Sequence, residues 1–318
     1  MTGEKGKTNL VLGTGPLGMS VMERLLLEGQ QVMMVNQSGQ ADVPEQVQVI
    51  KCDLVKETIP LEIIKKVDVV YHCIGLPYPQ WGKLKTIMNN VIQALRNSDT
   101  ILVYADNLYA YGPSHGKLVE TLLYRPVGKK TRIRADIATF VIEEHNKGNI
   151  RAAIGRGSDF YGPRVRNSAL GYRVFEHLLK DKSVDIFGNI DTPHTYIYIH
   201  DFAAGLVTLG TRTESLGEIW HIPSAETMTT RAMIEKICQE LGNSPSYRIA
   251  NRLILHALGL FNQEMRELKE IYYQFERPFV VNHNKYKTRF GEQVTPHEQA
   301  VRETIKWYRD QNSKNKIS

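Results

Sequence analysis

Residues 10–18 read Leu-Val-Leu-Gly-Thr-Gly-Pro-Leu-Gly, and this stretch decides the fold. Three apolar residues, typical of a buried parallel strand, run directly into Gly13, Gly15 and Gly18, which have the spacing G-x-G-x-x-G. Residues 17–27 then show helical spacing. In such a unit the first glycine permits the turn, the second lets a diphosphate approach the backbone, and the third lets helix pack on strand. The stretch therefore predicts a dinucleotide-binding turn formed by Gly13, Gly15, Pro16, Leu17 and Gly18.

The rest of the first half repeats this strand and helix alternation. Further strands are predicted at residues 31–35, 47–51, 67–73, 100–104 and 150–154, and helices at residues 81–97 and 132–145. Alternation at this spacing indicates a parallel sheet with helices on both faces, a doubly wound α/β Rossmann architecture. The ligand site of such a sheet lies beyond the carboxyl ends of its strands.

The pattern changes after residue 155. We expect a helix at residues 170–179 and strands at residues 184–187, 195–199 and 218–222. The sequence thus predicts a dinucleotide-binding domain over residues 1–160, completed by segments that return near residues 195–222. Residues 161–194 and 223–318 are predicted to form a smaller, mostly helical lobe that binds substrate.

Composition narrows the class of protein. The 318 residues are 42 % hydrophobic and 23 % charged, as in ordinary globular proteins, and the net charge of +6 is concentrated in the last quarter among interspersed acids. We expect a solvated surface there and no nucleic-acid partner. No apolar run is long enough to cross a bilayer, and residues 1–7 are polar, so we expect a cytoplasmic protein without a membrane partner. The cysteines and histidines lack ligand spacing, so no metal site is predicted.

Two later positions bear on the choice of dinucleotide. Asn36 stands about 20 residues after the turn, where an acidic residue would bind the ribose of NAD, and it is followed by Gln37 and Ser38. Because no carboxylate excludes a 2′-phosphate and no arginine binds one, the sequence favours NADP without excluding NAD. Asp53, after the third strand, either meets the adenine edge or caps the following turn.

Five motifs in order carry a family resemblance. After the glycine turn come Asp53-Leu54, VDVVYHCIG at residues 67–75, Tyr109-Ala-Tyr-Gly112, RGSDFYGPR at residues 156–164 and TYIYIHDFAAG at residues 195–205. The chain resembles the extended or atypical short-chain dehydrogenase/reductases, the NAD(P)-dependent epimerase/dehydratase group. The resemblance implies that Leu54 and Gly75 line the cofactor. It also implies a possible homodimer in which the helices at residues 81–97 and 132–145 form a four-helix bundle.

The catalytic pair of that family is absent. The family uses a tyrosine whose pKa is lowered by a lysine four residues later, because a free phenol is a poor base at neutral pH. When the family's Ala-Glu, which follows the lysine, is aligned with Ala135-Asp136, Gly128 falls at the position of the tyrosine and Arg132 at that of the lysine. No tyrosine of this chain has a lysine four residues later. The family's serine falls on Asn107, whose amide can still donate to a carbonyl oxygen.

Another acid would have to transfer the proton. Tyr109, Tyr111 and Tyr161 are the candidates, because each lies in a loop at the carboxyl edge of the sheet. We favour Tyr109 with Asn107, and Arg132 or Lys130 as the neighbouring cation; Tyr109 could instead pack against the cofactor or the second lobe.

Three further residues are expected near a small-molecule substrate. Tyr161 lies in the turn where the family contacts substrate, and Arg164 could bind a carboxylate or phosphate or simply lie on the surface. Trp81 could line the pocket or belong to the core. Asp201 is expected to cap a helix, and His72 to be a buried strand residue.

Two functions remain open on sequence grounds. One is an atypical NAD(P)-dependent oxidoreductase or epimerase acting on a small carbonyl, hydroxyl or sugar-like substrate. The other is a non-catalytic NADP-binding sensor or regulatory protein. The missing tyrosine and lysine favour the sensor, and the retained substrate-side turn at residues 160–163 favours the enzyme.

Overall fold

Seven parallel strands form the central sheet of the computed structural model, which describes residues 7–250 and 252–314. Across the sheet their order is β11, β6, β5, β4, β1, β2, β3. The strands are β1 (Thr8–Leu12), β2 (Gln31–Asn36), β3 (Gln48–Lys51), β4 (Val69–His72), β5 (Ile101–Asp106), β6 (Arg151–Arg156) and β11 (Ile219–His221). The predicted doubly wound parallel sheet is confirmed. The chain reverses direction across the sheet between β1 and β4, where a ligand crevice is expected.

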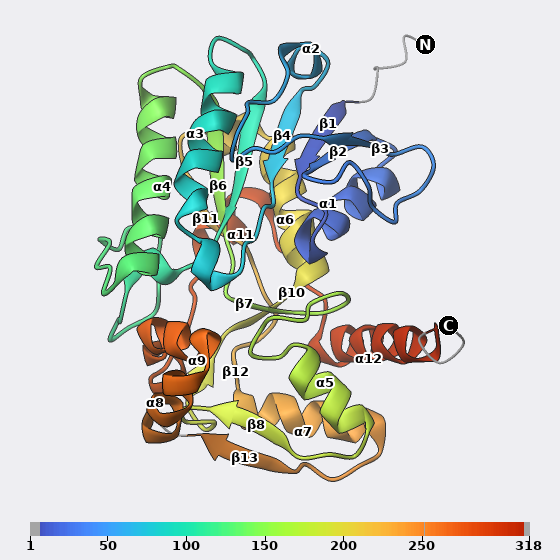
Figure 1. Ribbon diagram of the computed structural model, residues 1–318, viewed down its shortest axis with the longest axis vertical. Coiled ribbons are helices and arrows are strands. Elements are labelled where there is room, and N and C mark those ends of the chain that lie inside the picture. The colour runs from blue at the N-terminus through green and yellow to red at the C-terminus, as the bar shows by residue number, and fades with distance from the viewer. Residues whose placement is uncertain (1–6, 251, 315–318) are drawn as a thin grey trace.

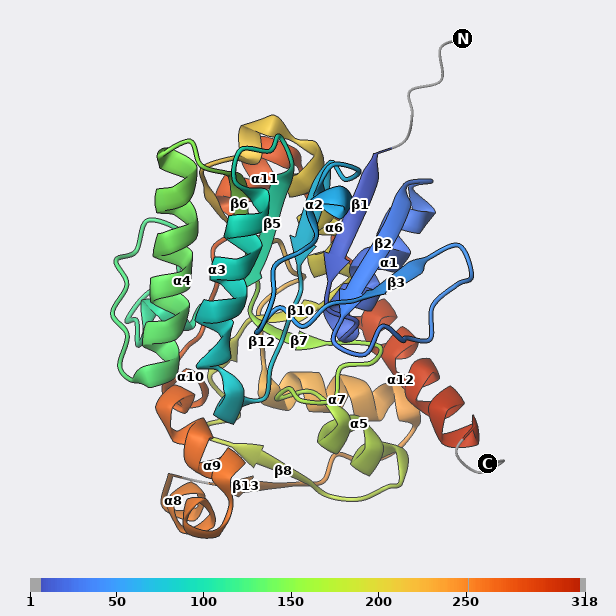
Figure 2. The same ribbon diagram turned by 45° about the horizontal axis from the view of Figure 1, so that its top comes forward.

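Helices cover both faces of this sheet (Figures 1 and 2). One face carries α3 (Lys83–Leu95) and α4 (Lys129–Asn146) over a core of apolar side chains, beside the short α2 (Leu61–Ile64). The other face carries α1 (Pro16–Leu27), α6 (Ile199–Thr211) and α11 (Asn284–Phe290). The apolar positions of α3, Leu84, Ile87, Val91 and Leu95, recur at helical spacing and are all buried.

Helix starts differ from the sequence prediction by a few residues. The helix predicted from residue 81 begins at Lys83, after the 3₁₀ turn η1 (Tyr78–Gln80), because Pro77 and Pro79 fix an extended and turned backbone there. The helix predicted from residue 132 begins at Lys129. A second 3₁₀ turn, η2 (Tyr109–Tyr111), follows β5.

The smaller lobe lies below the carboxyl edge of the sheet in Figure 1 and has its own apolar core. It contains helices and three short strand pairs, and most of its regular structure is helical, as predicted. Its helices are α5 (Tyr172–Leu179), α7 (Thr230–Leu241), α8 (Arg252–Phe261), α9 (Gln263–Leu268), α10 (Tyr273–Glu276) and α12 (His297–Lys314), with the 3₁₀ turn η4 (Lys269–Ile271) between α9 and α10. The strand pairs are β7 (Asp159–Tyr161) with β10 (Tyr196–Tyr198), β8 (Val184–Phe187) with β13 (Tyr247–Ala250), and β9 (Pro193–His194) with β12 (Met228–Thr229).

Two segments return from this region to the central sheet. α6 packs against α1, β5 and β6, and β11 pairs in parallel with β6 as its outer neighbour. The strand predicted at residues 195–199 forms β10, which pairs with β7 and not with the central sheet. The division at residue 160 stays a prediction.

Candidate active site

The glycine turn has the geometry of a diphosphate-binding loop. Gly13 has a φ of +97°, which side chains rarely adopt, and its N–H donates to the carbonyl of Val35 at 2.8 Å. A Cβ on Gly18 would lie 1.9 Å from the carbonyl oxygen of Gly13, so this glycine permits the contact between helix and turn. A Cβ on Gly15 would meet no atom within 4 Å. The turn is therefore packed tightly at its first and third glycines and open at its second.

Helix α1 begins at this open position. Gly15 is its N-cap, Pro16 is its first residue, and the first turn contains no acidic side chain. The backbone N–H groups and the positive end of the helix dipole therefore face the space beside Gly15. Leu17 is half-buried behind the turn.

The loop after β2 folds around Asn36. The amide nitrogen of Asn36 donates to Gln40 O at 2.8 Å and to Thr14 Oγ1 at 3.0 Å, and its oxygen accepts from Gly39 N–H at 2.6 Å. Ser38 Oγ also donates to Asn36 Oδ1. The Asn36 side chain thus holds the loop against the glycine turn, a structural role that the sequence prediction did not include.

Asp53 lies beside this loop and caps its own turn. Its Oδ1 accepts the Val55 N–H at 3.1 Å, which agrees with the turn-cap alternative; the adenine contact stays a prediction. The side chain of Gln37, the Val55 N–H and Lys56 hold the pKa of Asp53 below its usual value. Leu54 is buried in the core, and Gly75 is exposed just after β4, where a Cβ would meet nothing within 4 Å.

A buried cluster of aromatic side chains lies after β5. Tyr109 is 9 % exposed, and its ring stacks on Trp81 with centroids 6.2 Å apart and planes 20° apart. Trp81 Nε1 donates to Leu76 O at 2.8 Å, which fixes the indole. The Oδ1 of Asn107 accepts the backbone N–H of Tyr109 at 3.0 Å. The structure therefore brings together Asn107, Tyr109 and Trp81, three of the residues that the sequence singled out.

The phenol of Tyr109 faces Tyr78, Asp159 and Gln274. Burial, reinforced by Tyr78 and Asp159, raises the pKa of Tyr109 well above its usual value. Burial also raises the pKa of Tyr78 to about 12. Both phenols therefore stay protonated at neutral pH, so Tyr109 can donate a proton but is a poor base.

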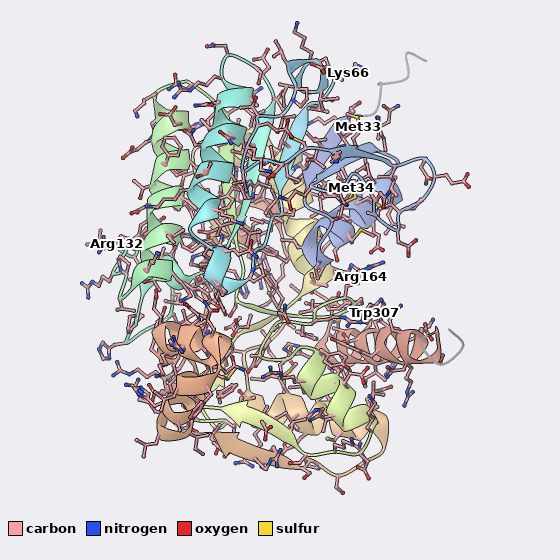
Figure 3. All side chains as sticks on the ribbon, viewed as in Figure 1. Met33, Met34, Lys66, Arg132, Arg164 and Trp307 are labelled. Atoms are coloured by element: carbon pink, nitrogen blue, oxygen red, sulfur yellow. The ribbon has the colours of Figure 1, made fainter. Side chains whose placement is uncertain are left out.

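Two cations lie near this cluster, Arg134 and Lys130, and Arg132 is not one of them; the Lys130 ammonium, one of the two predicted alternatives, lies 5.7 Å from the centre of the Tyr78 ring. Arg132 lies on the exposed face of α4 and points away from the sheet (Figure 3). Arg134, two residues later, is 8 % exposed; its guanidinium lies 4.4 Å from the centre of the Trp81 ring and donates to Tyr104 Oη at 2.8 Å. The helical register explains the difference, because Arg134 shares the inward face of α4 with Lys130 and Ile137.

The start of α4 is occupied by the smaller lobe. A Cβ on Gly128, where the family resemblance places a tyrosine, would lie 2.3 Å from the carboxyl carbon of Glu270. Glu270 Oε1 accepts the Thr131 N–H at 2.8 Å, and the Lys130 ammonium pairs with both Glu267 and Glu270. A tyrosine at residue 128 would have to displace Glu270. The space that the tyrosine of the family's catalytic pair would need is therefore filled by Glu270 in this chain.

A fully buried ion pair supports the carboxyl ends of β5 and β6. Arg156 and Asp106 are 0 % and 3 % exposed, and Arg156 Nε lies 3.0 Å from Asp106 Oδ2. Arg156 also donates to Tyr124 Oη at 2.8 Å. Beside it Tyr111 Oη and His221 Nε2 are 2.9 Å apart, and burial lowers the pKa of His221 to about 3. Tyr111 is thus hydrogen-bonded to a neutral histidine next to the Arg156–Asp106 ion pair.

Two of the expected substrate residues have other partners. Tyr161 is 0 % exposed, and its hydroxyl lies 2.8 Å from His297 Nδ1 in the core of the smaller lobe. Arg164 forms two hydrogen bonds with Glu23 of α1, the shorter 2.6 Å long, and so joins the two lobes (Figure 3). Trp81 remains in contact with the Tyr109 cluster. Asp201 was expected to cap a helix, and this is wrong: it is the third residue of α6, whose N-cap is Tyr198, and it accepts instead from the Thr295 N–H and hydroxyl.

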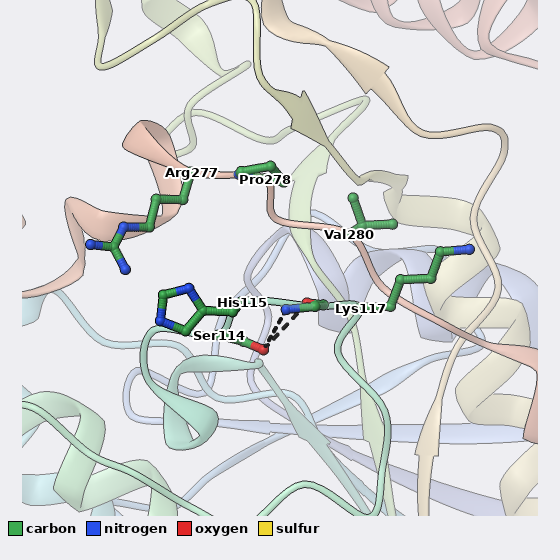
Figure 4. A pocket seen from close by; sticks show the side chains of 7 residues that line it. Ser114, His115, Lys117, Arg277, Pro278 and Val280 are labelled. Atoms are coloured by element: carbon green, nitrogen blue, oxygen red, sulfur yellow. Dashed lines mark hydrogen bonds between the residues drawn. The ribbon is translucent and has the colours of Figure 1, made fainter.

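Two open pockets lie away from these residues. One, of about 390 Å³, is lined by the loop after η2 and the segment after α10, with the basic residues His115, Lys117 and Arg277 at its walls (Figure 4). It contains none of the residues predicted from the sequence. Within the described part of the chain no group of three or more acidic, histidine or cysteine side chains could hold a metal ion, and no helix is long and apolar enough to cross a membrane.

Comparison with known proteins shows the family to which this chain belongs. The family model described as "NAD dependent epimerase/dehydratase family" matches residues 10–222. The chain belongs to that family. The matched part begins inside β1 and ends just past β11, so it contains the last three residues of β1, the other six strands of the central sheet and the whole glycine turn.

Individual relatives are distant in sequence. A Bacillus subtilis (strain 168) protein named "Uncharacterized UDP-glucose epimerase YtcB" is 23 % identical over 204 residues, which is 60 % of this chain and 64 % of that protein. The crystal structure of UDP-glucuronic acid 4-epimerase from Bacillus cereus in complex with NAD has a TM-score of 0.77 at 19 % identity, covering 96 % of this chain and 99 % of that one. UDP-glucose 4-epimerase from Thermus thermophilus, also with NAD, has a TM-score of 0.75 at 18 % identity, covering 95 % and 99 %. These structures share the fold of the epimerase/dehydratase family with this chain.

Proposed function

We propose that this member of the epimerase/dehydratase family binds a nicotinamide dinucleotide at Gly13–Gly18 and catalyses a redox reaction at a hydroxyl-bearing carbon of a small, sugar-like substrate. The open backbone beside Gly15, at the start of α1, carries the proposal. Gly13 and Gly18 form the turn, and the α1 N–H groups receive the diphosphate. When bound, the nicotinamide supplies reversible hydride transfer.

The loop after β2 bears on which dinucleotide binds. Asn36 holds the loop with its amide and brings no carboxylate that would repel a 2′-phosphate. A Cβ on Gly39 would lie 2.8 Å from Cβ of Lys51, so an exposed lysine flanks the loop. We therefore expect NADP to bind at least as tightly as NAD, although the structural relatives named above hold NAD. Calorimetric titration with each dinucleotide measures the preference directly.

Tyr109 is the proposed proton donor. The phenol is neutral at pH 7 and so carries a proton that it could give to a carbonyl oxygen as that oxygen is reduced, although burial, by raising its pKa, makes it a weaker acid than a free phenol. The amide nitrogen of Asn107, whose oxygen is used by the Tyr109 N–H, is the proposed donor that polarises the same carbonyl. Arg134 supplies the positive charge beside these groups, in the role that the sequence prediction gave to Arg132 or Lys130.

The test compares two tyrosines of the same 3₁₀ turn. Nicotinamide absorbance is followed with aldehydes, ketones and nucleotide sugars for the native chain, for Tyr109→Phe and for Tyr111→Phe. Because removal of a general acid lowers rates by about 10²–10⁴-fold, Tyr109→Phe should lose turnover while coenzyme affinity stays unchanged. Tyr111→Phe removes a hydroxyl that is already bound to His221, so it should keep its rate wherever it remains folded. Equal rates for native and Tyr109→Phe would exclude Tyr109 as the acid.

A second candidate is a dinucleotide-binding protein without turnover. The observation that favours it is Glu270, which fills the space beside Gly128 where the family resemblance places the catalytic tyrosine. Coenzyme binding with a flat absorbance response across the whole substrate panel would favour this sensor function over the enzyme.

A further inference from the structure

Asp159 places a carboxylate on the substrate side of the candidate site. It begins β7, and its Oδ2 lies 3.0 Å from Nε2 of His194 in β9. The imidazole of His194 is 2 % exposed and stacks on the ring of Phe275 with centroids 5.8 Å apart, so it is fixed in place. Among the described residues Asp159 Oδ1 has no hydrogen-bond partner, and the side chain is 13 % exposed. One oxygen of this carboxylate is therefore held by the protein and the other is free.

Asp159 also lacks a lysine or arginine partner within the described residues. The cations around Tyr109 are already paired with other acids: Lys130 with Glu267 and Glu270, and Arg134 and Arg156 with Asp106. The ion-pair partner of Asp159 in this part of the chain is His194 alone, which is charged only when it is protonated. A largely buried carboxylate without a cation is costly, so a ligand that donates a hydrogen bond to it would stabilise it.

Further unpaired polar atoms lie on the same side of the site. Gln274 of α10 is 1 % exposed, and neither atom of its amide has a hydrogen-bond partner among the described residues. The same is true of Tyr273 Oη and of Ser158 Oγ, next to Asp159 in the chain. Gln274 faces the phenol of Tyr109 without the geometry of a hydrogen bond, and Asp159 faces the same phenol. Because buried polar groups are nearly always paired, these atoms indicate the place of a polar ligand.

We propose that Asp159 Oδ1 binds a hydroxyl or amino group next to the reacting carbonyl of the substrate, and thereby selects uncharged or cationic substrates over anionic ones. This rests on the proposed function, in which Tyr109 protonates that carbonyl. A hydroxyl donates to Oδ1 and can also accept from the Gln274 amide, so it satisfies both groups. A carboxylate or phosphate in the same place would bring like charges together where little water screens them.

The test uses pairs of carbonyl compounds that differ only in the group next to the carbonyl, CH₂OH in one and a carboxylate in the other. The pairs are hydroxyacetone with pyruvate, and glycolaldehyde with glyoxylate. Nicotinamide absorbance reports the reduction of each by the native chain, by Asp159→Asn and by Asp191→Asn. We expect the native chain to prefer the hydroxyl member of each pair by at least about tenfold in kcat/KM, because like-charge contacts are strongly unfavourable.

Asp159→Asn keeps the size of the side chain and an acceptor for His194 but loses the charge. The preference for the hydroxyl member should therefore fall at least about tenfold, mainly through KM, because an interaction with bound substrate is changed. The matched control, Asp191→Asn, removes an exposed carboxylate of the smaller lobe that pairs with Arg231, so it should keep the native preference. Coenzyme titration of both variants reports that each is folded.

The role of Asp159 is overturned if the native chain prefers the carboxylate member of either pair, a measurement that needs no variant. It is also overturned, with the proposed function intact, if the native chain reduces these compounds and Asp159→Asn keeps the native preference. A native chain that binds no coenzyme, or binds it and reduces neither member of either pair, overturns the proposed redox reaction and the role of Asp159 together.

Discussion

The glycine turn allows a paired test, because two of its glycines exist for different physical reasons. At Gly18 a Cβ would fall about 1.5 Å short of ordinary contact with the carbonyl oxygen of Gly13, and that oxygen belongs to backbone that cannot rotate away. Gly18→Ala must push α1 from β1, a change that costs about 1–3 kcal/mol of unfolding free energy. For a chain of this size the midpoint of thermal unfolding should fall by about 1.5–5 °C.

Gly15→Val should behave in the opposite way. Its backbone is extended, with a φ of −74°, and the new side chain meets no protein atom, so the unfolding free energy should change by less than about 1 kcal/mol. The valine would instead fill the space that a diphosphate needs. We expect coenzyme affinity to fall at least about 100-fold, or roughly 2.7 kcal/mol.

The two measurements are thermal unfolding of the apo chain and calorimetric titration with each dinucleotide. Gly18→Ala should show the lower unfolding temperature, and Gly15→Val the lost binding without lost stability. Retention of native affinity by Gly15→Val would refute the placement of the diphosphate. A Gly18→Ala variant as stable as the native chain would refute the packing argument for the third glycine.

Three further outcomes follow from buried charges. Asp106→Asn leaves the buried guanidinium of Arg156 without its carboxylate and should cost about 3–5 kcal/mol in denaturant titration; a loss below about 1 kcal/mol would contradict the buried pair. Burial lowers the pKa of His72 to about 4 and that of His221 to about 3, so the unfolded chain alone takes up their protons below about pH 6.5. Stability should therefore fall as pH drops from 6.5 towards 4, and His72→Leu should flatten that slope by about 1.4 kcal/mol per pH unit. Glu270→Gln keeps the acceptor for the Thr131 N–H but loses the charge beside Lys130, so it should cost about 1 kcal/mol or less, whereas Glu270→Ala should cost more.

The central sheet could be predicted from the sequence because its signals are local. Each strand is a short apolar run, and the glycine spacing belongs to a single strand-turn-helix unit whose geometry depends on neighbouring residues. Where an observed helix boundary differs from the predicted one, as at the start of α3, the prolines in and just before η1 explain the difference.

The candidate site was only partly predictable. Asn107, Tyr109 and Trp81 were found because they follow parallel strands and so meet at one edge of the sheet. Arg134 was missed because the register of α4 was set by a family alignment; the inward apolar positions, such as Ile137, carried the signal that would have found it.

Contacts between distant segments had no signal in the sequence. Thr131 and Glu270 are 139 residues apart, and Tyr161 and His297 are 136 apart. No local pattern encodes such pairs, since the first forms only when the smaller lobe meets α4 and the second only when distant segments of the smaller lobe fold together. The same holds for Arg164, whose partner Glu23 lies in α1, 141 residues away in the sequence.

The late return of α6 and β11 to the central sheet decides how the polypeptide can be divided. A fragment that stopped after β6 would leave an unsatisfied edge on that strand and would strip the covering from α1 and β5. Such a truncation should aggregate instead of yielding a miniature coenzyme-binding module. Nicks or insertions are better placed in exposed connections such as residues 115–117, where a cut would separate no strand of the central sheet from its neighbours.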